Sequence, residues 1–175
     1  MPGLRQRVLG RQAQSFCFPL PEPARIALLE TGFRRGPNMC ECSVDDLLWL
    51  RVWGPEALVL PLGLALALAN RKQHRLFDLP SLNRAIVVLT SVDETPLASR
   101  HRDLLWSAFG VPVFEQLCGA DGMVIARECE VHDGLHFEAG KLHGVRGEIV
   151  TDYCACGSEM PRLRGREFRK SATAA

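Results

Sequence analysis

The sequence predicts an α/β or α+β fold, in which a helical N-terminal half packs on a small mixed sheet that ends in a β-hairpin and zinc-knuckle region. Three observations predict it. The first half carries segments with helical character. The run Ala85–Leu89 is short, branched and apolar, which is typical of a buried strand. An amphipathic segment and several strand-like segments then follow, and this order is typical of chains with mixed architecture.

The composition sets the class of protein before any motif is considered. A chain of 175 residues, 47% hydrophobic and 23% charged, can bury a core of its own. Lysine and arginine number 21 and aspartate and glutamate 20, so the net charge of +1 gives no reason to expect nucleic acid or a membrane as partner. The longest nearly apolar run, 57–69, is shorter than the ~20 residues of a membrane span. No secretory signal is visible, and we expect a cytoplasmic protein.

Residues 1–37 are expected to form an N-terminal extension. This segment is rich in arginine, and three prolines close together indicate an extended backbone. A short helix is expected to follow over 24–30.

Two further helices are expected before the first strand. Ser43 with an aspartate three residues later has the pattern of a capping box, which predicts a helix over 44–52 that Gly54 ends. Residues 62–70 are apolar on all sides. A helix of this kind is buried or covered by a partner, so we expect a protein partner or a second copy of the chain to contact it.

The second half is expected to contain one helix and a series of strands. Thr95 and a proline after it predict the start of a helix over 96–109, which a glycine ends. Strands are expected at four places: 111–117, 123–130, 134–138 and 148–151. The Asp-Gly pair between the first two is a strong hairpin signal. The tail after Pro161 is basic, and we expect it to be frayed and solvated.

Cysteine and histidine residues in the last third carry the strongest chemical signal. Zinc prefers four tetrahedral thiolate and imidazole ligands. Cys154 and Cys156 belong to a Cys-x-Cys-Gly sequence, and such a turn can direct both sulfurs at one ion. If the strands on either side of turn 131–133 pair, Cys129 and His136 come close together. The resulting Cys₃His site would have no open position, so its role would be structural.

Alternative ligands stay open at this point. His132, in the turn, can replace His136. Cys40 and Cys42 form a second Cys-x-Cys, which can complete a Cys₄ site or lie at a helix start with a lowered thiol pKa. Plain burial of the thiols is the third interpretation, because cysteine is among the most buried residue types. Two further cysteines are interpreted as core residues: Cys17 and Cys118.

Motifs for several kinds of catalysis are missing. The sequence has no Walker-type phosphate loop, no G-x-G-x-x-G, no G-x-S-x-G and no H-E-x-x-H. The acidic pairs at 45–46 and 93–94 are interpreted as helix-dipole partners. We therefore name no catalytic residue.

Several motifs resemble the adenylate-forming phenylacetate–coenzyme A ligase family. They are Leu-Pro-Ser-Leu to Glu-Thr-Pro-Leu over 79–97, Phe-Gly-Val-Pro-Val-Phe-Glu over 109–115, and Glu-Cys-Glu followed by His-Asp-Gly-Leu-His over 128–136. The likeness covers 58–163 and is most specific around 109–136. It implies a ligase-like α/β domain over 38–163. Some family members bind zinc through a Cys-x-Cys-Gly knuckle, which resembles the sequence at 154–157.

The departures from the family matter for function. The family's Tyr-Gly-x-Thr-Glu motif, which contacts adenylate and magnesium, should follow Phe114, but its tyrosine, threonine and glutamate are absent here. The Ser/Thr/Gly-rich ATP loop and the lid domain with its catalytic lysine have no counterpart. We therefore expect a truncated, degenerate member that binds neither ATP nor coenzyme A, with 164–175 as a basic tail.

Three functions follow from this comparison. The first is a non-catalytic, zinc-stabilised module that binds a partner or a small acyl or nucleotide ligand. The second is a component of an ATP-dependent acyl-CoA ligase whose ATP loop and lid are on another chain. The third is a nucleic-acid-binding zinc module, ranked last because the spacing does not fit a zinc finger.

Overall fold

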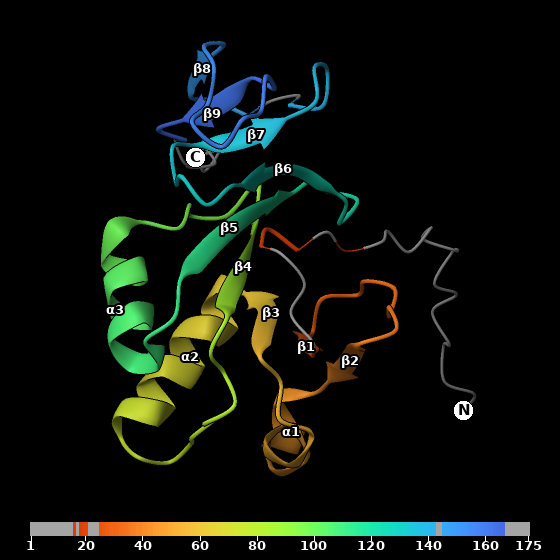
Figure 1. Cartoon of the computed structure of the whole chain (residues 1–175), viewed down its shortest axis with the longest axis vertical. Coiled ribbons are helices and arrows are strands. Elements are labelled where there is room, and N and C mark those ends of the chain that lie inside the picture. The colour runs from red at the N-terminus through yellow and green to blue at the C-terminus, as the bar shows by residue number, and fades with distance from the viewer. Residues whose placement is uncertain (1–15, 17, 21–24, 143–144, 167–175) are drawn as a thin grey trace, which may run out of the picture.

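The computed structural model of the chain describes residues 16, 18–20, 25–142 and 145–166. Its elements follow one another in this order (Figure 1): β1 Ile26–Leu29, β2 Met39–Cys42, the 3₁₀ turn η1 Val44–Asp46, α1 Leu47–Trp53, β3 Ala57–Pro61, α2 Leu62–Gln73, β4 Ala85–Ser91, α3 Ser99–Phe109, β5 Val113–Cys118, β6 Val124–Glu128, β7 Leu135–Phe137, β8 Glu148–Val150 and β9 Arg162–Arg164.

The described strands form one mixed sheet in the order β2-β1-β3-β4-β5-β6-β7-β9-β8. Neighbours from β2 to β5 are parallel, and neighbours from β5 to β8 are antiparallel. α2 and α3 provide the crossovers that parallel pairing of β3, β4 and β5 requires. The predicted α/β class is therefore confirmed, and β5 is the strand at which the sheet changes from parallel to antiparallel.

The parallel strands are apolar along their whole length because both of their faces are covered. On one face they pack against all three helices, with Leu50 of α1, Leu68 of α2 and Leu105 of α3 fully buried. Figure 1 shows α2 and α3 side by side on this face. The other face packs against aromatic residues near the N-terminus, including Phe16 and Phe33.

Most of the predicted elements are present, and their ends follow the expected local chemistry. The side chain of Ser43 accepts a hydrogen bond from the backbone N–H of Asp45, and the turn η1 leads into α1. Gly54 ends α1 in the left-handed conformation. Four predicted strands are confirmed as β5, β6, β7 and β8. The helix expected over 62–70 is α2, which extends to Gln73.

Two expectations about local structure are wrong. Residues 26–29, expected in a short helix, form β1 between two parallel strands, because a short buried apolar run has no diagnostic period. Cys40 and Cys42 lie directly before the Ser43 cap, as expected, and they do so on the edge strand β2, which the sequence did not predict. α3 begins at Ser99 rather than at Pro96; His101 caps it by accepting from the backbone N–H of Ala98.

The segments expected to be an extension and a tail both contribute to the described sheet. β1 comes from segment 1–37, and the β9 strand after Pro161 lies between β7 and β8. The domain boundaries at 37 and 163 stay predictions, and 167–175 lies outside the described residues, as do Cys17 and His143. Among the described helices, none has the length and apolar character that a membrane span requires.

Arg166, expected to be frayed, is instead buried against the sheet. Its guanidinium lies 3.0 Å from a carboxylate oxygen of Glu115 and donates to the carbonyl oxygen of Ser91 at 2.8 Å. The hydroxyl of Thr90 donates to the same oxygen of Glu115. With side chains 4% and 7% exposed, Arg166 and Glu115 form a buried ion pair that ties the residues after β9 to β4 and β5.

Arg166→Ala should lower the free energy of unfolding by about 3 kcal/mol, because it leaves the carboxylate of Glu115 buried without its cation. Urea unfolding measures this. The matched control is Arg84→Ala, whose half-exposed guanidinium pairs with Glu56 and should cost under ~1 kcal/mol. If both substitutions lower the free energy of unfolding by the same small amount, Arg166 does not hold the residues after β9 against β4 and β5.

Candidate metal centre

A β-hairpin positions the first two residues of the predicted site. β6 and β7 pair antiparallel, with Arg127 opposite His136, and Cys129 directly follows β6. Gly134 has a φ of 93°, and a Cβ there would lie 2.9 Å from the carbonyl oxygen of Leu163. The turn therefore packs closely on β9. The pairing that was expected to bring Cys129 near His136 is confirmed.

A tight turn presents the other two residues. The backbone N–H of Gly157 donates to the carbonyl oxygen of Cys154 at 2.9 Å. The backbone N–H of Cys154 donates to the carbonyl oxygen of Ser158 at 3.3 Å. Gly157 has a φ of 87°, which is left-handed and disfavours a residue with a Cβ. The turn directs the side chains of Cys154 and Cys156 toward the hairpin.

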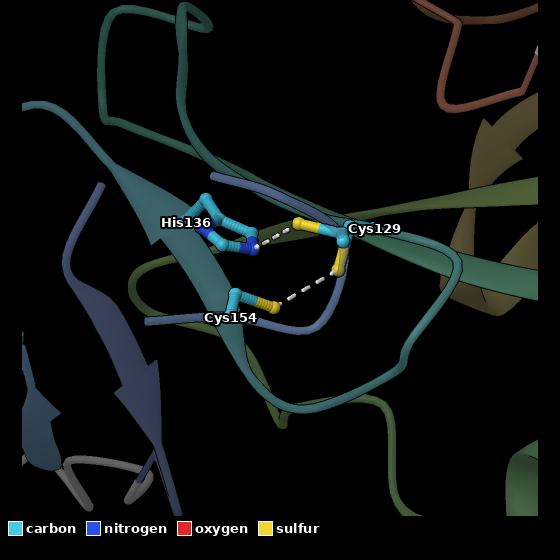
Figure 2. Close-up of side chains that lie close together, drawn as sticks. Cys129, His136 and Cys154 are labelled. Carbon is cyan, nitrogen blue, oxygen red and sulfur yellow. Dashed lines mark hydrogen bonds between the residues drawn. The ribbon is translucent and has the colours of Figure 1, made fainter. Parts of the chain in front are cut away.

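The four donor atoms converge on one point. The Sγ atoms of Cys129, Cys154 and Cys156 and a ring nitrogen of His136 all lie within 4.8 Å of one another. The sulfurs of Cys129 and Cys154 lie 3.9 Å apart. Figure 2 shows them facing each other, with the imidazole of His136 beside them. The Nε2 of His136 lies 3.5 Å from the Sγ of Cys156. The structure therefore brings together a Cys₃His group that can hold a metal ion.

These two distances match the edges of a tetrahedral zinc site. With Zn–S near 2.3 Å and Zn–N near 2.0 Å, tetrahedral angles place two sulfurs about 3.8 Å apart and a sulfur and a nitrogen about 3.5 Å apart. Two of the six donor–donor distances are therefore at tetrahedral spacing, and all six are within 4.8 Å.

A backbone acceptor sets the orientation of the imidazole. The Nδ1 of His136 lies 3.3 Å from the carbonyl oxygen of Met160. When Nδ1 carries the proton and donates to this oxygen, the lone pair of Nε2 points toward the sulfurs. This outer contact is typical of histidines that bind metals.

Burial shapes both the protonation of the site and access to it. Burial raises the pKa of the Cys129 thiol to about 12, whereas a hydrogen bond from the backbone N–H of Cys156 is the main cause that lowers the pKa of Cys154. A cation is therefore needed to hold Cys129 as a thiolate. A cavity of about 250 Å³ borders Cys129, His136 and Cys156, so the cluster lies next to open space.

The alternative ligands lie elsewhere. The Nδ1 of His132 is 3.2 Å from a carboxylate oxygen of Glu128, and its ring stacks on Phe114 with 4.8 Å between centroids. The sulfurs of Cys40 and Cys42 lie 3.2 Å apart on β2, at the far edge of the sheet. Burial raises the pKa of both thiols, so the expected lowering at Cys42 is wrong.

Sequence reasoning missed the polar residues that surround the site. Arg162 is fully buried and pairs with the carboxylates of Asp133 and Asp152, although the sequence placed it in a frayed tail. The signal that could have found it is the alternation Arg-Leu-Arg over 162–164, which is typical of a strand.

Comparisons with known proteins support the fold. No family model matches the sequence, and no curated protein matches it. The open conformation of 2-hydroxyisobutyryl-CoA ligase, in complex with 2-HIB-AMP and CoA, is similar with a TM-score of 0.61 and 13% identity, over 81% of this chain and 44% of the ligase chain. The same ligase in its thioesterification state is similar with a TM-score of 0.57 and 13% identity, over 81% and 42%.

This likeness defines the fold of the chain and nothing finer. The chain shares the fold of part of an adenylate-forming ligase, and it spans less than half of that ligase's length. The expected likeness to an adenylate-forming enzyme is therefore confirmed at the level of fold. Membership of the phenylacetate–coenzyme A ligase branch stays a proposal.

Gly157→Ala should lower the free energy of unfolding by about 1–2 kcal/mol, because a Cβ is strained at its left-handed φ. Thermal and urea unfolding measure the change. Gly63→Ala is the matched control, since this α2 residue has open space around it and should be neutral or stabilise by up to ~1 kcal/mol. Similar effects at both positions would contradict a special role of the turn.

Proposed function

We propose that this chain is a non-catalytic, zinc-stabilised module with the fold of part of an acyl-CoA ligase, and that it binds a protein partner or a small acyl or nucleotide ligand. The convergence of three thiols and one imidazole on a point is the observation that carries this proposal. We also propose the phenylacetate–coenzyme A ligase family as its origin, on the motifs over 109–136.

The chemistry of the donors favours zinc. Soft thiolates with one imidazole, at tetrahedral spacing, are typical ligands of structural zinc. Four protein donors leave no position for water or substrate, which argues against a catalytic ion. Thiolates stay available as ligands where they are kept reduced, and this supports a cytoplasmic location.

A metal would supply stability where apolar packing is weakest. β7, β8 and β9 have three residues each. The apolar cluster beneath them contains five buried residues: Leu117, Ala126, Leu135, Phe137 and Leu163. One ion bound to Cys129, His136 and the turn at 154–156 would join three separate segments of this region.

The residues at the carboxyl ends of β4 and β5 support a non-catalytic role. This is the edge at which open α/β sheets usually bind ligands. Arg166 donates to the carbonyl oxygen of Ser91, the last residue of β4, and its ion pair with Glu115 lies on the inner part of β5. The segment 117–122 lacks the tyrosine, threonine and glutamate of the ligase motif. We therefore propose that neither ATP nor coenzyme A binds.

A partner is proposed on the layer of helices. Helix α2 faces the core with Leu62, Ala65 and Leu68, whereas its Leu64 and Leu66 are only partly buried. On α1, Leu48 and Val52 are 81% and 86% exposed. Exposed apolar side chains of this size favour contact with another protein, and a second copy of this chain is one candidate.

A second function calls for a direct test because the chain covers only 44% of the similar ligase. In this alternative the chain is a component of an acyl-CoA ligase, and another chain supplies the ATP loop and the lid. The two functions differ in whether the chain takes part in turnover of ATP.

Purified protein should contain about one zinc ion per chain by elemental analysis. Removing the ion with a chelator, or Cys154→Ser, should lower the free energy of unfolding by several kcal/mol, because the cross-link between segments is lost. Cys118→Ser, at a half-buried cysteine outside the cluster, is the control and should keep the zinc. A metal-free protein that is fully folded would exclude the proposal.

The protein alone, given ATP, magnesium and phenylacetate or 2-hydroxyisobutyrate, should release no pyrophosphate above the blank, because the sequence lacks the phosphate-loop motifs that hold a triphosphate. A coupled pyrophosphate assay checks this. The known ligase serves as the positive control. Robust turnover would overturn the non-catalytic function and favour the ligase-component alternative.

A further inference from the structure

Arg162 lies between the two segments that carry the metal donors. It is on β9, and its register partner on β7 is His136. Its side chain is 2% exposed, which is rare for an arginine. A guanidinium buried to this degree needs charged partners.

The guanidinium bridges the hairpin turn and the segment before the knuckle. Its Nη1 contacts the carboxylate of Asp133 and lies 3.4 Å from the carbonyl oxygen of the same residue. Its Nη2 contacts the carboxylate of Asp152 and lies 3.5 Å from that carbonyl oxygen. Each end of the planar fork therefore meets both the side chain and the backbone of one aspartate.

The two aspartates are placed next to the donors along the chain. Asp133 lies in the turn between Cys129 and His136, and Asp152 lies two residues before Cys154. The planar guanidinium of Arg162 holds the backbones of Asp133 and Asp152, and this sets the distance between the hairpin and the Cys154–Cys156 turn. The length of this bridge thus controls how far the sulfur of Cys129 lies from that of Cys154.

The charge of Arg162 also suits a thiolate-rich site. A divalent cation with three thiolates and a neutral imidazole carries a net charge of about −1. Arg162 carries its fixed positive charge on the strand that pairs with His136, where it can offset this negative charge.

We propose that Arg162 is the positioning residue of the metal centre, which holds the two donor-bearing segments at ligand distance through Asp133 and Asp152. This inference rests on the proposed zinc-binding function. It assigns Arg162 no contact with the ion. The ammonium of lysine cannot replace it, because a single point charge does not form a fork between two carboxylates.

The test measures metal binding in the full chain under reducing conditions. Metal-free wild type, Arg162→Lys and Asp152→Asn are titrated with Co²⁺ and then with Zn²⁺ in competition with a chelating dye. We expect Arg162→Lys to weaken Zn²⁺ binding about 10- to 100-fold and Asp152→Asn about 10-fold. The Co²⁺ absorption bands, which report ligand geometry, should shift in both variants.

Two variants control for changes in charge and in stability. Arg84→Lys and Asp93→Asn make the same chemical changes at residues outside the donor cluster and the Arg162 bridge, and both should keep the affinity and the spectrum of the wild type. If Arg162→Lys does not fold, Asp152→Asn tests the positioning role. The Asp152 side chain is 67% exposed, so this substitution should leave the chain folded.

The failures of the two proposals are distinguishable. A wild-type chain that binds neither ion overturns the proposed function together with the inference. If the wild type binds both ions while both site variants keep its affinity and spectrum, the inference alone is wrong. A lower melting temperature with unchanged metal binding also overturns the inference alone, because Arg162 would then be only structural.

Discussion

The fold of the C-terminal third depends on polar cross-links, because little apolar packing is available there. In the described residues, 21 buried apolar residues form the core between the sheet and the helices, whereas five form the core under the antiparallel strands. Strands of three residues make few ladder hydrogen bonds. A region built in this way needs cross-links such as the Cys₃His cluster and the ion pairs of Arg162 to hold its segments together.

The parallel half of the sheet supports this region through β5 and β6. Glu128, the last residue of β6, is buried, and its carboxylate accepts hydrogen bonds from the guanidinium of Arg102 on α3 and from the backbone N–H of Glu115 on β5. Cys129 is the next residue along the chain. The first metal donor is therefore anchored to a helix and a strand of the large core, and the remaining donors are arranged around it.

The sequence predicts features whose signals lie close together along the chain, and it misses features that depend on residues far apart in the sequence. The donor set was found because its signals are local: a Cys-x-Cys-Gly turn, and a hairpin that brings Cys129 near His136. β1 was missed because four apolar residues have no diagnostic period, and only its two parallel neighbours make it a strand. The role of Arg162 was missed because its partners are 10 and 29 residues away.

The fold and the site together favour a structural role for the metal. A catalytic ion needs an open coordination position, whereas the Cys₃His group offers four protein donors within 4.8 Å of one another, as many as a structural zinc site uses. What the chain shares with the ligase is the fold of part of that enzyme. In the proposed function, a metal bound by the three cysteines and the histidine would cross-link the weakly packed C-terminal third of this fold.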